Sequence, residues 1–197
     1  MIKSKTFRLV AILVLAGCGG EDSLKNVPPQ NERVCCFGDS LVAGNGADTK
    51  DERYPNVLAT LIDRDVTNWG VAGNTTTDGL RRIDRFASEP PFGVVIVTLG
   101  GNDLVRQLPL AETEKSLRAI FKRIQETGAV VVYTSVTSPV SLKRRNMYKR
   151  VCVEEHVLFI PNVLKGILTN NDLKADFLHP NGAGYKAMSE RVAAALK

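Results

Sequence analysis

Residues 94–99 (VVIVTL) form the clearest strand pattern in the chain. The run is apolar and rich in β-branched residues, with no regular alternation of polar side chains, which is typical of a strand buried on both faces of a parallel sheet. Residues 100–103 (GGND) follow at once, so the chain turns where the strand ends. The stretch therefore predicts a central parallel strand with polar residues at its carboxyl end.

Eight further segments extend this pattern on both sides of the strand. Short apolar runs that predict buried strands cover residues 34–37, 66–69, 129–134 and 156–160. Helical spacing of apolar residues covers residues 54–62, 77–86, 111–126 and 181–196. Because strands and helices alternate, the sequence predicts an α/β protein, a three-layer α/β/α sandwich with helices on both faces of a parallel sheet.

Length and composition fit a single folded domain. The chain has 197 residues, 44% of them hydrophobic and 24% charged, so it can bury a core and is not a disordered protein. Its four cysteines are too few for a disulfide scaffold. The two histidines and the scattered cysteines lack metal-ligand spacing, and residues 38–46 (GDSLVAGNG) match no complete phosphate-binding motif. We therefore expect neither a metal nor a cofactor.

Residues 1–17 have the pattern of an export signal. A basic start precedes the apolar run 9–16, which is well short of the ~20 residues that cross a bilayer as a helix. The run ends in residues 15–18 (LAGC), which resemble the lipobox of bacterial lipoproteins, where the chain is cut before the cysteine and the cysteine is acylated. Cys18 is therefore the expected lipidation site. A plain secretory signal with a chance cysteine is the alternative.

Export changes the meaning of the net charge. Residues 1–17 contain three basic and no acidic residues, so their removal lowers the charge from +5 to +2, and we expect no nucleic-acid partner. Residues 18–32 are polar, which predicts a lipidated tether. Residues 33–197 form the expected domain, and we expect this domain to be a monomer.

The residue after the cysteine bears on localisation. Gly19 stands where lipoproteins of the inner membrane often carry Asp. We therefore expect a lipid-anchored protein of the bacterial envelope, on the outer membrane facing the periplasm.

Four polar loops follow predicted strands or precede the last helix. They are residues 38–41 (GDSL), 70–74 (GVAGN), 100–103 (GGND) and 176–180 (DFLHP). In a sheet of this kind the chemistry lies just beyond the carboxyl ends of the strands. We therefore expect the four loops to meet at one edge of the sheet.

Three side chains in these loops match the requirements of nucleophilic catalysis. The Ser40 hydroxyl needs a base to remove its proton, and the chain offers only two imidazoles, His156 and His179. His156 begins an apolar segment with no aspartate nearby, so we interpret it as structural. Asp176 lies three residues before His179 and can orient the imidazole, as in a Ser-His-Asp triad.

An acyl-transfer site also needs hydrogen-bond donors for the oxyanion. The candidates are the backbone N–H groups of Ser40 and Gly73 and the side-chain amide of Asn102. Gly73 allows the backbone to approach a substrate closely because it has no side chain. Each motif alone is a common turn sequence, and only the combination is specific.

Together and in this order, the loops resemble the SGNH (GDSL) hydrolase family, whose four marker residues correspond to Ser40, Gly73, Asn102 and His179. The resemblance covers residues 33–197. It is closest to the arylesterase, acyl-thioesterase and lysophospholipase type, and it is carried by residues 38–44, 54–55, 100–103 and 108–110. It implies the SGNH hydrolase fold, a flavodoxin-like five-stranded parallel sheet.

The resemblance also implies an activity. The expected enzyme is a serine esterase that hydrolyses carboxylic ester or thioester bonds of lysophospholipids, aryl esters or acyl thioesters through an acyl-enzyme. Two other functions stay open: a carbohydrate O-acetyl esterase acting on envelope glycans, and a non-catalytic envelope lipoprotein. Ala72 and Asn74 stand where relatives often have Ser and an acidic residue, and residues 138–145 depart from the expected pattern, so chain-length preference cannot be carried over.

Two features fall outside the predicted site. Cys35 and Cys36 are neighbours on a strand and therefore face opposite sides, which predicts two small buried hydrophobic residues; Cys152 could pair with one of them. A basic cluster covers residues 143–150, and we interpret it as a solvated helix face, with docking on anionic lipid heads as the alternative.

Overall fold

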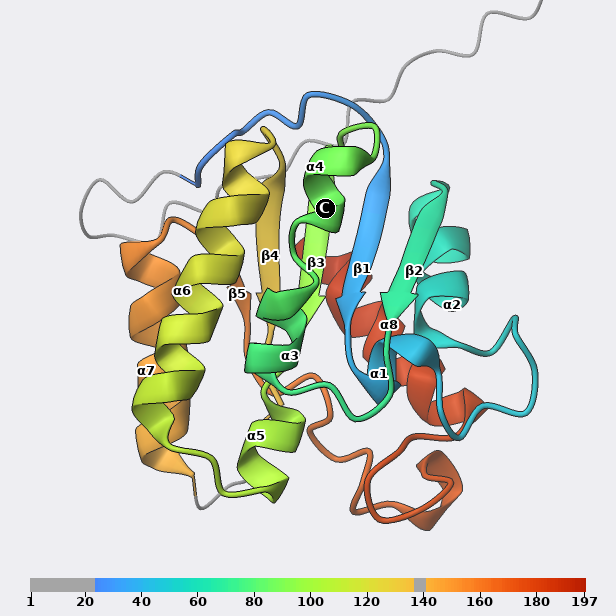
Figure 1. The fold of residues 1–197 in the computed structure, drawn as a ribbon. Helices are drawn as coiled ribbons and strands as arrows, with labels where there is room; N and C mark the ends of the chain where they lie inside the picture. Colours follow the sequence, from blue (N-terminus) through green and yellow to red (C-terminus); the bar gives the residue numbers. More distant parts are fainter. Residues whose placement is uncertain (1–23, 137–140) are drawn as a thin grey trace, which may run out of the picture.

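The computed structural model describes residues 24–136 and 141–197, which form a five-stranded parallel sheet covered by helices (Figure 1). The strands are β1 (Val34–Gly38), β2 (Val66–Gly70), β3 (Val94–Thr98), β4 (Val130–Thr134) and β5 (Leu158–Ile160). Their order across the sheet is β2-β1-β3-β4-β5, and all four neighbouring pairs are parallel. The predicted α/β fold and parallel sheet are confirmed.

The apolar run at residues 94–99 contains β3, the middle strand of the sheet. β3 lies between β1 and β4, with Val94 opposite both Val34 and Val130. Its side chains alternate between two hydrophobic cores, because Val95 and Val97 belong to one and Ile96 to the other. Burial on both faces explains why the run shows no polar alternation.

Helices cover both faces of the sheet. They are α1 (Ser40–Ala43), α2 (Tyr54–Ile62), α3 (Thr76–Arg81), α4 (Arg85–Ser88), α5 (Gly101–Val105), α6 (Leu110–Glu126), α7 (Leu142–Glu154) and α8 (Gly182–Ala195), with a short 3-10 helix at Asn171–Leu173. Residues of α6 and α7 pack into one core, and residues of α2 and α8 pack into the other. This arrangement is the predicted three-layer sandwich.

Several helices differ from the sequence prediction. The expected helix 77–86 is two short helices, α3 and α4, because the chain leaves α3 at Arg82, whose side chain bonds to carbonyl groups at the ends of β1 and β2. The short helices α1 and α5 have no clear apolar periodicity and were not predicted. The helix expected at the basic cluster 143–150 is α7, which extends beyond the cluster at both ends. β5 begins at Leu158, two residues later than expected.

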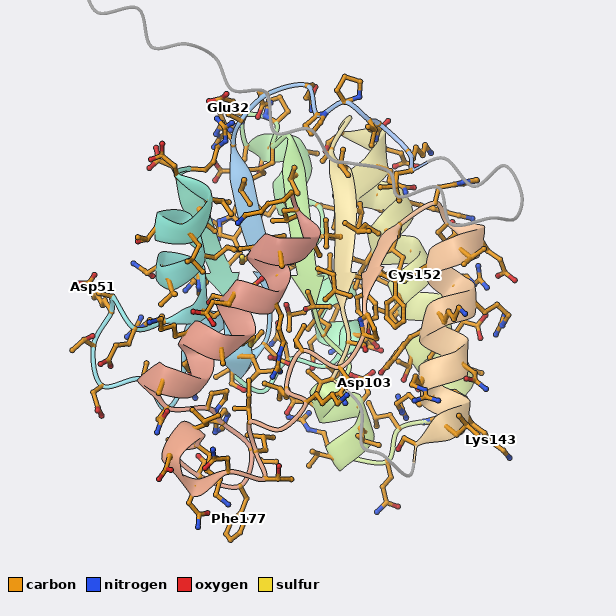
Figure 2. All side chains as sticks on the ribbon, turned by 180° about the vertical axis from the view of Figure 1, so that it is seen from behind. Glu32, Asp51, Asp103, Lys143, Cys152 and Phe177 are labelled. Atoms are coloured by element: carbon orange, nitrogen blue, oxygen red, sulfur yellow. The ribbon has the colours of Figure 1, made fainter. Side chains whose placement is uncertain are left out.

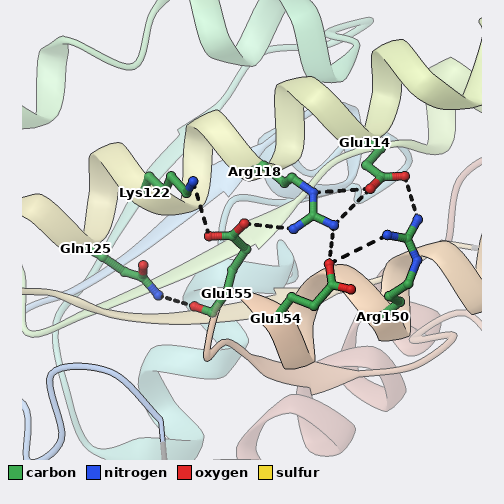
Figure 3. A network of polar contacts seen from close by, with 7 residues as sticks. All are labelled: Glu114, Arg118, Lys122, Gln125, Arg150, Glu154 and Glu155. Carbon is green, nitrogen blue, oxygen red and sulfur yellow. Dashed lines mark hydrogen bonds and ion pairs between the residues drawn. The ribbon is translucent and has the colours of Figure 1, made fainter. Parts of the chain in front are cut away.

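An ion-pair network joins α6 to α7 on the surface (Figure 3). Arg118 bonds to Glu114, Glu154 and Glu155, and Arg150 also bonds to Glu114 and Glu154. A network of alternating charges holds the two helices together more effectively than isolated surface pairs would.

This network corrects the interpretation of the basic cluster. Arg150 is neutralised by two glutamates, and Arg144 is buried, with its guanidinium bonded to Thr113 Oγ1 and Leu108 O, both at 3.2 Å. Only part of the cluster therefore remains a solvated helix face. The sequence could not reveal this, because the partners lie on other elements.

The cysteines behave as small hydrophobic residues. Cys35 packs into one core and Cys36 into the other, as their neighbouring positions on β1 predict. Cys152 is also buried, and all three are free thiols, so the pairing that the sequence left open does not form. Burial raises the pKa of each thiol above its ordinary value.

The folded body begins before the expected boundary at residue 33. Asn26 Nδ2 donates to Gln125 O and Ala129 O, both at 2.9 Å, and Gln30 Nε2 donates to Thr127 O at 2.9 Å. Residues from 25 onward therefore lie against the domain, and the expected tether 18–32 is too long. The expected signal peptide 1–17 and Cys18 lie outside the described residues.

Candidate active site

A cavity of about 360 Å³ opens at the edge of the sheet where the strands end. In Figure 1 the strand arrows point toward α1, α5 and the loop that precedes α8. Parts of all four predicted loops line the cavity. The lining residues include Ser40, Gly73, Asn102 and His179, together with apolar side chains such as Leu104, Val136, Leu164 and Leu168.

Ser40 is placed by a sharp turn from β1 into α1. Gly38 ends the strand, and a Cβ atom there would lie 2.3 Å from Thr98 O, so only glycine fits. Asp39 then caps the helix, with its Oδ1 accepting the N–H of Leu41 at 3.0 Å. Ser40 is the first helical residue, and its side chain projects beside the cavity.

The structure brings Ser40, His179 and Asp176 together. His179 Nε2 lies 3.0 Å from Ser40 Oγ, and His179 Nδ1 lies 2.8 Å from Asp176 Oδ2. Both are hydrogen-bonding distances, and Ser40 and His179 lie 139 positions apart in the sequence. The arrangement has the geometry in which an imidazole takes the proton of a serine while a carboxylate orients the ring.

The loop that holds His179 is tightly bonded to itself. Asp176 Oδ1 accepts two backbone N–H groups, from Leu178 at 2.6 Å and from His179 at 2.8 Å. The side-chain bond to His179, together with these backbone bonds, lowers the pKa of the Asp176 carboxyl below its ordinary value. The carboxylate therefore stays ionised at neutral pH, in the form that can accept a hydrogen bond from the N–H at His179 Nδ1.

The three expected oxyanion donors line the same cavity. Gly73 has a φ of 79°, a left-handed conformation that other residues rarely adopt. Asn102 Nδ2 donates to Asn74 O at 2.9 Å and, over a longer 3.5 Å, to Asp39 Oδ2. The first bond fixes the amide, and the second is weak enough to be exchanged for a negatively charged oxygen in the cavity.

Asp39 has a buried carboxyl group that the sequence interpretation did not consider. Its side chain is 2% exposed, and burial raises its pKa to about 7, against the opposing effect of its bond to the Leu41 N–H. Its position directly before Ser40 was the only signal in the sequence. The carboxyl contacts both the nucleophile helix and Asn102, so it belongs to the site.

Asp103 is a second buried carboxylate that sequence reasoning missed. It accepts the backbone N–H and the hydroxyl of Thr76, at 2.9 and 2.5 Å, and the hydroxyl of Thr113 at 3.2 Å. These bonds join the start of α5 to α3 and α6. Asn102, the preceding residue, is therefore held on a rigid support.

Three exposed apolar side chains, which we call the apolar rim, lie on the elements that surround the cavity. Val105 ends α5 and is 56% exposed, while Phe177 and Leu178 precede His179 and are 89% and 52% exposed. Val105 and Leu178 also line the cavity. Phe177 is almost fully exposed and adjoins Leu178, so the apolar rim extends outward from the cavity.

The second histidine takes no part in this site. His156 is exposed after the end of α7, and its carbonyl accepts the N–H of Lys25 at the opposite edge of the sheet. Its φ of 56° and the bond from Val157 N to Cys152 O close the helix, so its role is structural, as expected.

Comparison with known proteins finds a matching family model and several similar proteins. A family model described as the GDSL-like lipase/acylhydrolase family matches residues 36–187. The chain is 27% identical to esterase TesA of Pseudomonas aeruginosa, covering 84% of this chain and 88% of that protein. It is 26% identical to thioesterase 1/protease 1/lysophospholipase L1 of Escherichia coli, covering 76% of each. Among solved structures, the SGNH-hydrolase family esterase AlinE4 superposes with a TM-score of 0.68 at 31% identity, covering 85% of this chain and 98% of AlinE4.

Proposed function

Because the chain belongs to the GDSL-like lipase/acylhydrolase family and is a serine ester hydrolase, we propose that Ser40, His179 and Asp176 are its catalytic triad. The observation that carries this proposal is the pair of hydrogen-bonding distances, 3.0 Å from Ser40 to His179 and 2.8 Å from His179 to Asp176. The open position of Ser40 on the cavity wall supports it.

The reaction starts with acylation of Ser40. His179 Nε2 takes the hydroxyl proton while Ser40 Oγ attacks the carbonyl carbon, and the negative charge moves to the carbonyl oxygen. The N–H groups of Ser40 and Gly73 and the amide of Asn102 stabilise this oxyanion, each donor contributing about 3 kcal/mol. When the tetrahedral intermediate collapses, His179 gives its proton to the departing alcohol or thiol, and Ser40 keeps the acyl group.

Water then completes the cycle. His179 removes a proton from a water molecule, whose oxygen attacks the acyl carbon, and the oxyanion is stabilised by the same three donors. The second intermediate collapses to the free acid and returns the proton to Ser40. Asp176 keeps the imidazole in the required tautomer throughout and stabilises the imidazolium that forms in both steps.

The substrate that we propose is an ester or thioester with an apolar acyl chain. Leu104, Val136 and Leu164 provide an apolar wall beyond Ser40, and the cavity of about 360 Å³ far exceeds the volume of an acetyl group. The apolar rim at the mouth suits the same substrates. The name of the Escherichia coli relative includes thioesterase and lysophospholipase, and we propose this substrate range here.

We further propose that the enzyme is anchored to an envelope membrane through an acylated Cys18. The support is the sequence of residues 15–18, which lie outside the described residues. No helix within residues 24–136 and 141–197 is long and apolar enough to cross a bilayer. Residues 18–24 could span at most about 24 Å between an anchor and the folded body.

The triad is tested by Ser40→Ala on the full chain. We expect this variant to lose at least about 10⁴-fold in kcat on p-nitrophenyl butyrate and to lose labelling by a fluorophosphonate. Ser88→Ala, on the surface helix α4, is the matched control and should keep both. Wild-type turnover by Ser40→Ala would overturn the assignment.

Two further measurements test the substrate and the anchor. In a series of p-nitrophenyl esters, kcat/KM should rise from acetate toward medium chains, because longer chains bury more apolar surface against the cavity wall. A strong preference for acetate would instead indicate a deacetylase.

The anchor is tested by Cys18→Ser, which should move the protein from the membrane fraction to the soluble fraction. Unchanged fractionation would show that Cys18 is not the anchor.

A further inference from the structure

Arg82 connects three segments that surround the proposed oxyanion hole. Its Nη2 donates to Gly38 O at 2.7 Å, its Nη1 donates to Trp69 O at 3.0 Å, and its Nε donates to Asn74 Oδ1 at 2.8 Å. The guanidinium also lies 4.1 Å from the centre of the Phe37 ring. All three nitrogens of the planar guanidinium therefore have acceptors. This requires the three acceptors to lie in the fixed geometry of the group.

Each of these acceptors lies next to a group that the proposed reaction needs. Gly38 is two residues before Ser40. Trp69 is the buried residue of β2, one position before the end of the strand, from which the Gly73 loop departs. Asn74 directly follows Gly73. Arg82 thus contacts both backbone segments that carry the proposed oxyanion N–H groups.

The third oxyanion donor is connected to the same point. Asn74 receives a bond from Arg82 at its side-chain oxygen and a bond from Asn102 Nδ2 at its backbone oxygen, the latter at 2.9 Å. Asn74 is therefore held from both sides, by the arginine and by the amide donor. Movement of Arg82 would change the position of the Gly73 N–H and of the Asn102 amide together.

We propose that Arg82 is a positioning residue that fixes the three donors of the oxyanion hole relative to one another. The inference rests on the proposed function, since the oxyanion is its premise. Arg82 does not line the cavity, so it acts through Asn74 and the strand ends rather than on the substrate. Its effect should fall on the transition state, where the donors must meet the oxyanion, and not on substrate binding.

The chemistry of the side chain explains why an arginine suits this position. A lysine could donate to one or two of the three acceptors but lacks the fixed fork that reaches all of them at once. Partial burial lowers the pKa of the Arg82 guanidinium to about 10, so the group remains charged at neutral pH. Charged donors make shorter and stronger bonds than neutral ones, which stiffens the loop.

Its neighbour Arg81 offers a matched control. Arg81 is the last residue of α3, its side chain is 75% exposed, and it pairs with Asp78 at 3.1 Å on the surface. The two arginines are adjacent in sequence and of the same type. Only Arg82 is bonded to the strand ends and to the loop of Gly73 and Asn74.

The test compares Arg82→Met, Arg82→Lys and Arg81→Met in the full chain, with p-nitrophenyl butyrate as substrate. We expect both Arg82 variants to lose about 10- to 100-fold in kcat with KM changed less than threefold, since small displacements of catalytic groups have effects of this size. Arg81→Met should keep kcat within twofold. Added methylguanidinium should restore part of the activity of Arg82→Met but not that of Asn102→Ala.

A double variant separates positioning from a general loss of stability. If Arg82 acts through Asn74, the kcat of Arg82→Met/Asn74→Ala should match that of the more impaired single variant rather than the product of both losses. Multiplicative losses, or a kcat of Arg82→Lys equal to wild type, would overturn the proposal. If Arg82→Met fails to fold, Arg82→Lys and Asn74→Ala still decide the question.

Failure of this proposal can be distinguished from failure of the proposed function. An active Ser40→Ala variant would remove the proposed function itself. An inactive Ser40→Ala variant combined with Arg82 variants as active as Arg81→Met would leave the triad in place and overturn only the role of Arg82.

Discussion

The two edges of the sheet are used in opposite ways. At the edge where the strands begin, the chain closes the sheet with its own residues: Asn26, Gln30 and Asn31 donate side-chain bonds to backbone carbonyl groups of the loops there. At the edge where the strands end, a cavity remains between the loops. Figure 2 shows the separation, with Glu32 at one end of the molecule and Phe177 at the other.

The polar groups at the two edges also differ in their partners. Around residues 25–33 the side-chain amides are bonded to carbonyl oxygens of the same chain. At the other edge, the buried Asp39 and the half-buried Asn102 share one long bond of 3.5 Å, and burial raises the pKa of Asp39 to about 7. Polar groups buried without strong partners cost stability.

We infer from this difference that the edge where the strands begin contributes mainly to stability and the edge where they end contributes mainly to catalysis. Changes at the closed edge should lower the free energy of unfolding and leave turnover unchanged. Changes at the open edge should lower turnover and leave the free energy of unfolding unchanged or increased.

The largest expected effect lies at the open edge. Asp176→Asn should lower kcat by about 10³- to 10⁴-fold, because an amide at this position favours the wrong tautomer of His179 and cannot stabilise its imidazolium. The Asp176 side chain is 54% exposed, so the unfolding midpoint in urea should change little. Asp65→Asn, an exposed aspartate before β2, is the matched control and should keep its kcat. A large loss of stability in Asp176→Asn would break the comparison.

The next effect concerns stability at the same edge and depends on pH. The pKa of Asp39 is raised to about 7 in the folded state, so between about pH 4 and pH 7 the folded protein binds more protons than the unfolded chain, and its stability falls as pH rises. Asp39→Asn cannot ionise, so its stability should not fall in this way, and asparagine is also a good helix cap. Its free energy of unfolding should therefore exceed that of the wild type at pH 8, by at most about 4 kcal/mol.

Urea unfolding at pH 4, 6 and 8 measures this difference. The advantage of Asp39→Asn should grow with pH and level off above pH 7. A constant difference across the range would show that the Asp39 carboxyl does not titrate in this window. A lower free energy of unfolding of Asp39→Asn at pH 8 would show that the buried Asp39 carboxylate does not destabilise the folded protein.

The strands and the residue types of the segments that bring Ser40, Asp176 and His179 together could be predicted because their signals are local. Residues 94–99 are buried on both faces and so must be apolar and β-branched, whatever their neighbours are. The Ser40 hydroxyl, the Gly73 backbone and the His179 imidazole are each the residue type that the chemistry needs. Parallel topology alone brings their loops to one edge.

The rest depended on partners that one sequence does not reveal. In the sequence, Arg144 and Arg150 look like solvated surface residues. Their partners Thr113 and Glu114 lie on α6, 31 and 36 positions away along the chain. Asp103 and Arg82 gave no motif of their own, since their roles come from contacts with α3, α6 and the strand ends. Residues 25–32 are polar and rich in proline, so they indicated a tether although their side chains bond to the domain.

The smallest expected effect lies at the closed edge. Asn26→Asp has the same shape and tolerates the φ of 64° at this position, but it replaces the amide that donates to Gln125 O and Ala129 O by a carboxylate facing two carbonyl oxygens. It should lower the free energy of unfolding by about 2 kcal/mol and leave kcat within twofold. Asn146→Asp on the exposed face of α7 should change neither value. A tenfold loss of kcat in a folded Asn26→Asp variant would show that the two edges are coupled through the strands, and the division between them would fail.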